Sequence, residues 1–131
     1  MGYQFEEHGG EVEISLSAPS EAGVFVAALE AFAALATDDE SGQHCVEEVA
    51  LVGSDRALLL VDWLNELVVL AELRRFVPEQ VETLELLDDG LRAIVQGHRG
   101  APNPLVKAAT LSNLRLEREG GTWHGRVVVD V

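Results

Sequence analysis

The chain has 131 residues and a mass of 14.2 kDa, and 47% of its residues are hydrophobic while 24% are charged. This is the size of one ordinary domain with a core, and the composition excludes collagen, disulfide scaffolds and bulk disorder. The formal charge is −14, from 23 acidic and nine basic residues, so direct nucleic-acid binding through phosphate contacts is not expected.

The negative charge is concentrated in the first half of the chain. Residues 1–55 hold twelve acidic residues and no Lys or Arg, whereas residues 56–131 hold eleven acidic and nine basic residues. A negative face could steer a basic partner or a cation, although solubility explains such a charge equally well. The single cysteine, Cys45, and the lack of a signal-like or membrane-spanning segment predict a soluble, cytoplasmic protein.

Hydrophobic periodicity predicts a strand, a helix, a strand, a helix and then four strands. In chain order these elements span residues 11–17, 21–36, 46–52, 55–76, 81–87, 91–96, 106–117 and 122–131, with loops at 37–43 and 97–104. Ser20 can cap the first helix, and Ser54 or Asp55 the second. The last four strands form two hairpins, which turn at Asp88-Asp89-Gly90 and at Gly120-Gly121.

Early helices followed by runs of strands predict an α+β fold. We expect two layers, with both helices packed on one face of a mainly antiparallel sheet. No composition break or repeat interrupts the sequence, so residues 1–131 are expected to form a single compact domain.

The sequence carries no nucleotide-binding, nucleophile-elbow or zinc motif, which argues against a stand-alone enzyme. Asp62, Asn65 and Glu66 lie at positions i, i+3 and i+4 of the second predicted helix and share one face. This face is a candidate for partner docking. A solvated stripe on an otherwise buried helix is the simpler explanation.

The two ends of the chain carry a second candidate site. His8 and Glu11 open the first predicted strand, and Asp130 and the carboxylate of Val131 close the last. If adjacent strands bring these ends together, the carboxylates would form an all-oxygen site suited to Ca²⁺, Mg²⁺ or Mn²⁺. The alternative is two unrelated exposed acids, and the residue pattern taken alone favours that alternative.

Four segments in order resemble the archease family and span nearly the whole chain. Residues 5–11 stand where archeases carry an E-H-T-A-D stretch, and residues 60–67 are similar to the family helix L-V-x-W-L-N-E-L. Residues 106–110 resemble the family strand I-K-A-V-T, and residues 128–131 resemble the closing F-D-[VI].

The sequence departs from the family pattern at two places. Glu11 stands in place of the early Asp of the family, after Gly9-Gly10 in place of Thr-Ala. Glu is one methylene longer, which alters the geometry of a cation site but keeps the ligand type. Leu111-Ser112 stands where the family strand continues into Tyr-His.

The resemblance implies a compact α+β fold and a non-catalytic accessory role. Archeases act on the RtcB-type RNA ligase, which joins RNA ends with GTP and Mn²⁺; they promote the ligase–guanylate intermediate and repeated turnover in tRNA splicing and RNA repair. The resemblance also implies a divalent cation, Ca²⁺ first with Mg²⁺ or Mn²⁺ as alternatives. Its ligands would be Glu11, Asp130 and Val131, with His8 as nearby polar support.

Two other functions stay open. The first is a chaperone-like modulator of another RNA-modifying enzyme, such as a tRNA methyltransferase. The second is a small metal-dependent hydrolase built on the same carboxylates, which would turn over a substrate without a partner. The hydrolase ranks last because the sequence offers no constellation of base and nucleophile.

Overall fold

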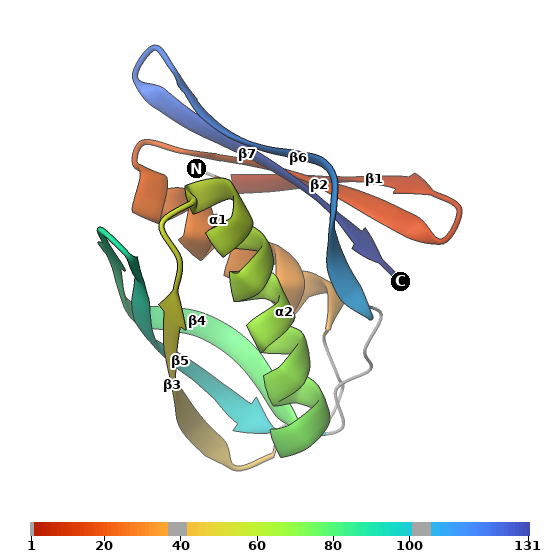
Figure 1. Ribbon diagram of the computed structural model, residues 1–131. Helices are drawn as coiled ribbons and strands as arrows, with labels where there is room; N and C mark the ends of the chain where they lie inside the picture. The colour runs from red at the N-terminus through yellow and green to blue at the C-terminus, as the bar shows by residue number, and fades with distance from the viewer. Residues whose placement is uncertain (1, 37–41, 101–105) are drawn as a thin grey trace.

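The computed structural model describes residues 2–36, 42–100 and 106–131. Within these ranges the chain forms strands and two helices in the order shown in Figure 1. The elements are β1 (Gly2–His8), β2 (Glu11–Ala18), α1 (Glu21–Leu35), β3 (His44–Val52), α2 (Arg56–Arg74), β4 (Phe76–Leu87), β5 (Gly90–Arg99), β6 (Ala108–Glu119) and β7 (Thr122–Asp130).

The strands form two antiparallel sheets with the helices between them. One sheet has the order β1-β2-β7-β6 and the other β3-β5-β4. In Figure 1 both helices lie between the sheets, where α1 packs on β2 and β4 and α2 packs on β6, β4 and β3. The α+β class is confirmed. The expected single sheet with helices on one face is wrong, because α2 is apolar nearly all round and needs cover on more than one side.

One hydrophobic cluster joins the two sheets through the helices. Its largest fully buried side chains include Trp63, Phe25 and Phe76. The indole Nε1 of Trp63 donates to the carbonyl oxygen of Phe25 at 2.9 Å, which fixes α2 against α1 and satisfies a buried polar atom. Among the described residues, no helix is both long and apolar enough to cross a bilayer.

Both helices begin at predicted caps. The Ser20 hydroxyl accepts a hydrogen bond from the N–H of Gly23 at 3.0 Å, and an Asp55 carboxylate oxygen accepts from the N–H of Leu58 at 3.1 Å. Each bond satisfies a helix N–H that has no partner within the helix. The caps therefore set both starts locally, as the sequence predicts.

Strand β1 was not predicted. It pairs with β2 along its whole length, and the two-residue turn Gly9-Gly10 joins them. Gly9 has φ 65°, a conformation that glycine adopts without strain and that suits the first position of a type II′ hairpin turn. The alternation of Tyr3 and Phe5 with polar residues, followed by Gly-Gly, is the sequence signal for this hairpin.

The three-stranded sheet also extends further than predicted. β4 begins at Phe76, ahead of the predicted start at residue 81. Its pairing is irregular after Pro78 and after Val81, which interrupts the period-two pattern, so the sequence did not mark this start. β5 continues to Arg99, into the segment predicted as the 97–104 loop. Residues 101–104 of that predicted loop and residues 37–41 of the predicted 37–43 loop lie outside the described residues.

Candidate functional site

The β1–β2 turn and the C-terminal end of β7 meet at one end of the four-stranded sheet. Glu11 of β2 lies directly opposite Asp130 of β7 in antiparallel register. The backbone N–H of Val131 donates to the carbonyl oxygen of Gly10 at 3.0 Å, and that of Lys107 donates to the carbonyl oxygen of Asp130 at 2.8 Å. These backbone bonds fix the last residues of the chain beside the β1–β2 turn.

The acidic side chains share the outer face of this sheet. Val12 and Ile14 are buried on the helix side, so the alternating Glu11 and Glu13 point to the opposite face. Cross-strand register places His8 on the same face, opposite Glu11. Within the described part of the chain, neither Glu11 nor Asp130 uses its carboxylate in a hydrogen bond or ion pair, so both remain available to a ligand.

A second group of ligand-type side chains lies on the same face and was missed. One ligand atom each from Glu6, His8 and Glu13 lies within 4.8 Å of the others, and His8 Nε2 is 3.4 Å from Glu6 Oε1. Glu6 and Glu13 are cross-strand partners and carry like charges, and Arg126 Nε lies 3.9 Å from Glu13 Oε1. The alternation of acids on both sides of the Gly-Gly turn is the signal that could have found them.

The side chains of Glu11 and Asp130 are of the donor type that hard divalent cations take. Glu11 and Asp130 are directly opposed in an antiparallel pair, which places their Cβ atoms about 4.5–5.5 Å apart. Among the described residues, the set of three His or acidic ligand atoms that lie within 4.8 Å of one another is Glu6, His8 and Glu13, and it does not include Glu11 or Asp130. Carboxylate oxygens are the ligands that Ca²⁺, Mg²⁺ and Mn²⁺ prefer. His8 stands opposite Glu11 and can hydrogen-bond a ligand or a carboxylate there.

Asn65 is not available to a docking partner. Its Nδ2 donates to the carbonyl oxygen of Ala109 at 3.3 Å, and the N–H of Ala109 donates to its Oδ1 at 2.8 Å. The preceding residue, Ala108, pairs with Asp130, so Asn65 fixes β6 beside the candidate cation site. Asp62 and Glu66 form no ion pair with another described residue, and their docking role stays a prediction.

A buried charge cluster lies away from this site. The Glu47 side chain is 6% exposed and bonds to Arg74 Nη1 at 3.1 Å and to Arg99 Nη2 at 3.3 Å. The cluster joins β3, the end of α2 and the end of β5. Burial raises the pKa of the Cys45 thiol, an effect that the positive charge of Arg99 partly opposes. A less reactive thiol beside a satisfied ion cluster indicates a structural role.

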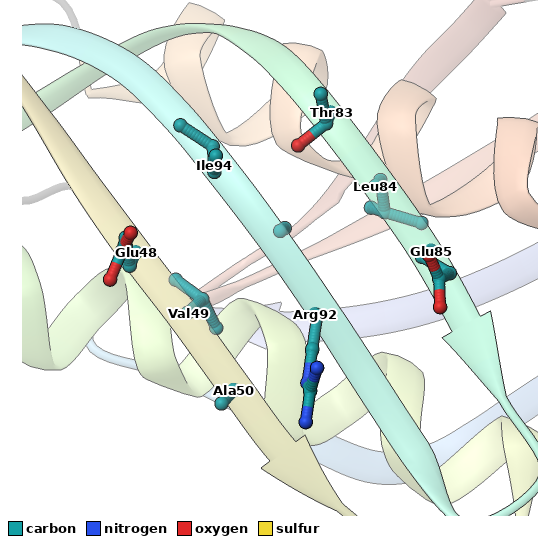
Figure 2. A pocket seen from close by; sticks show the side chains of 9 residues that line it. Glu48, Val49, Ala50, Thr83, Leu84, Glu85, Arg92 and Ile94 are labelled. Carbon is teal, nitrogen blue, oxygen red and sulfur yellow. The ribbon is translucent and has the colours of Figure 1, made fainter.

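The outer face of the three-stranded sheet carries a shallow depression of about 590 Å³. Figure 2 shows its side chains rising side by side from β3, β5 and β4, with Glu48, Arg92 and Glu85 among them. This depression lies on the other sheet from Glu11 and Asp130. The two features are therefore separate.

A family model described as the archease protein family matches residues 3–131. The chain belongs to the archease family. It is 30% identical over 139 residues to "Protein archease" of Methanosarcina mazei, covering 98% of this chain and 95% of that protein. It is 30% identical over 140 residues to "Protein archease" of Methanopyrus kandleri, covering 100% of each. The resemblance found in the sequence is confirmed.

Two solved structures have the same fold as this family member. The solution structure of Methanobacterium thermoautotrophicum protein 1598 matches with a TM-score of 0.70 and 23% identity, over 99% of each chain. The crystal structure of an archease from Thermotoga maritima, described as a possible chaperone, matches with a TM-score of 0.70 and 16% identity, over 96% of this chain and 94% of that one.

The archease-like helix segment 60–67 has identifiable structural tasks. Trp63 fixes α2 to α1, and Asn65 fixes α2 to β6. Two residues of the archease-like segment thus hold the fold together: Trp63 joins the two helices, and Asn65 joins α2 to the strand beside the candidate site.

Proposed function

We propose that the chain is an archease-type accessory protein that activates an RtcB-type RNA ligase. It would promote GTP-dependent guanylylation of the ligase and its repeated turnover in tRNA splicing and RNA repair, without itself catalysing ligation. The observation that carries this proposal is the pairing of exposed Glu11 with half-buried Asp130 where β2 and β7 meet. Archease membership over residues 3–131 supports it.

In this proposal Glu11, Asp130 and the carboxylate of Val131 hold a divalent cation, with Ca²⁺ as the first candidate and Mg²⁺ or Mn²⁺ as alternatives. The bound ion would supply a localised positive charge among the carboxylates. Backbone bonds from Val131 to Gly10 and from Lys107 to Asp130 keep the carboxylates in place. We expect Glu11, with its longer side chain, to bind the ion more weakly than Asp would.

The protein would act by docking through its acidic outer face. Residues 1–55 carry twelve acids and no base, and β1 and β2 contribute Glu6, Glu11 and Glu13 to that face. Such a surface is complementary to the basic surface of an enzyme that binds nucleic acid. RNA itself need not touch this protein, because acidic residues outnumber basic ones 23 to nine and phosphate affinity comes from Lys and Arg.

The test is multiple-turnover ligation by the cognate RtcB-type ligase, with ligase substoichiometric and GTP and Mn²⁺ present. We expect the wild-type protein to restore turnover and Asp130→Ala to abolish the effect. The Asp130 carboxylate bonds no described residue, so the variant should fold. Glu119→Ala, at the opposite end of β6, is the matched control.

Two outcomes contradict different parts of the proposal. Full stimulation by Asp130→Ala would refute the site. No stimulation by the wild-type protein, with the ligase shown to be active, would refute the function. Calorimetric titration with Ca²⁺, Mg²⁺ and Mn²⁺ tests the cation alone, and we expect Glu11→Gln to weaken binding and Glu11→Asp to strengthen it.

A chaperone-like modulator of another RNA-modifying enzyme, such as a tRNA methyltransferase, is the second candidate. It is favoured by the description of the Thermotoga maritima archease as a possible chaperone. Affinity capture separates the two, because an RtcB-type ligase should dominate the captured proteins in the first case and be absent in the second.

A further inference from the structure

Exposed apolar side chains gather along α2 and β3. Eight large apolar residues are exposed among the described residues, and five of them lie on these two elements. The five are Val46, Val52, Leu58, Val69 and Leu73. Leu73 is 79% exposed and Val46 is 47% exposed. Three of the five, Val46, Val69 and Leu73, line one groove, and apolar side chains gathered in this way are typical of an interaction surface.

A groove of about 650 Å³ lies between α2 and β3. Val46 of β3 and Val69 and Leu73 of α2 line it, together with Glu48 and Glu66. Both walls therefore combine exposed apolar side chains with acidic ones. In Figure 1, β3 is the edge strand of the three-stranded sheet on the side where α2 lies.

β3 is an open edge. The sheet order is β3-β5-β4, so within the described residues β3 pairs on one side only. Its register with β5 is unbroken from His44 to Val52. The opposite edge strand, β4, contains Pro78 and two irregularities, features that discourage further pairing. β3 has no Pro, Lys or bulge and can accept another strand.

The hydrogen-bond pattern shows which β3 residues face the open edge. Arg99 N–H donates to the carbonyl oxygen of Gln43 at 2.9 Å, and Gly53 N–H donates to that of Asp89 at 2.7 Å. In an antiparallel pair, residues that bond to the neighbour alternate with residues that point away. Odd-numbered β3 residues thus bond to β5, and the N–H and C=O groups of 46, 48 and 50 point outward. Figure 2 shows Glu48 and Ala50 along this strand.

The charges of the groove favour a basic partner. Neither Glu48 nor Glu66 forms an ion pair with a described residue, whereas Arg74 is bonded to Glu47 at 3.1 Å. The unpaired charge facing the groove is therefore negative. A symmetric pairing of two copies centred on Glu48 would oppose like charges, and each copy carries −14.

We propose that this groove binds an extended segment of a partner protein, which adds as a strand to the open edge of β3. One set of its side chains would lie against Val69 and Leu73 of α2. The other set would lie beside Val46 and Glu48, with Lys or Arg meeting the acidic groups. The groove lies on a different sheet from Glu11 and Asp130, so this proposal does not depend on the ligase function.

The probe for the test is a fluorescein-labelled seven-residue peptide of alternating Val and Lys, measured by fluorescence anisotropy. Ala50→Pro removes an outward N–H while leaving the ladder to β5 intact. We expect it to weaken binding about tenfold, a loss equivalent to about 1.4 kcal/mol. The matched control, Ala50→Ser, should bind like wild type.

Thermal unfolding shows whether Ala50→Pro is folded. If it is not, two further variants test the proposal. Leu73→Lys and Glu48→Lys leave the backbone unchanged, and both should weaken binding, while Glu119→Lys should not. Hydrogen exchange should show the added strand as new protection of the amides of 46, 48 and 50. Absence of saturable binding by wild type, or full affinity in Ala50→Pro or in both Lys variants, would overturn the proposal. Self-association through β3 would also overturn it.

Discussion

Asn65 offers the sharpest test of how the fold builds the candidate site. Its amide forms two hydrogen bonds with the backbone of Ala109, at 2.8 and 3.3 Å, and Ala109 is only 7% exposed. Asn65→Ala removes both bonds. The N–H and C=O of Ala109 then lose their partners at the point where α2 meets β6.

The expected cost follows from these two groups. A buried polar group left without a partner costs about 1–3 kcal/mol, and partial access of water to this half-buried site puts the total at about 2–3 kcal/mol. In a domain of this size each kcal/mol lowers the melting temperature by about 3–5 °C, which predicts a decrease of about 6–15 °C. Asn65→Asp keeps only the acceptor and should lie in between.

The assay is thermal and urea unfolding of both variants, with Asp62→Ala as the matched control. Asp62 is exposed on the same helix and forms no ion pair with a described residue, so its loss should change stability by less than about 0.5 kcal/mol. If Asn65→Ala is no less stable than Asp62→Ala, the pairing of Asn65 with β6 does not hold the fold, and the account of this site fails.

Three further predictions concern the core and the charge cluster. Trp63→Phe should lower the free energy of unfolding by about 2–4 kcal/mol, because it removes the buried hydrogen bond from the indole to the Phe25 carbonyl oxygen and opens a cavity; urea unfolding measures this. Glu47→Gln should cost about 1–2 kcal/mol, measured in the same way, because charge-assisted bonds to two half-exposed arginines become neutral ones. Cys45 should react with iodoacetamide more slowly than glutathione at pH 8, because its raised pKa leaves less thiolate, and Arg99→Ala should slow it further.

Local chemistry made much of the fold predictable. Ser20 and Asp55 cap the helices as expected, and the β6–β7 hairpin turns at Gly120-Gly121, between Glu119 and Thr122. The division into two sheets was not predictable, because it depends on which distant strands pair, and β2 with β7 is a pairing between the two ends of the chain. An amphipathic pattern shows that a strand is covered, but not by which element.

In the candidate site too, the residue types were predictable from the sequence, but their partners in space were not. The residue types at Glu11 and Asp130 predict a hard-oxygen site, yet only the register shows that the two face each other. Asn65 looked like a surface residue because its helical spacing matches Asp62 and Glu66. Its partner is a backbone group in a strand far along the chain, for which helical periodicity gives no signal.

The measurement that tests the central proposal most directly is single-turnover guanylylation of the cognate RtcB-type ligase with labelled GTP. The account predicts that the wild-type protein accelerates formation of the ligase–guanylate. Glu11→Gln and Asp130→Asn, which keep size and fold but remove one charge each, should lose most of that acceleration, while Glu119→Gln should keep it. Equal acceleration by wild type and Asp130→Asn would contradict the account, because the carboxylates where β2 and β7 meet would then have no part in the activity.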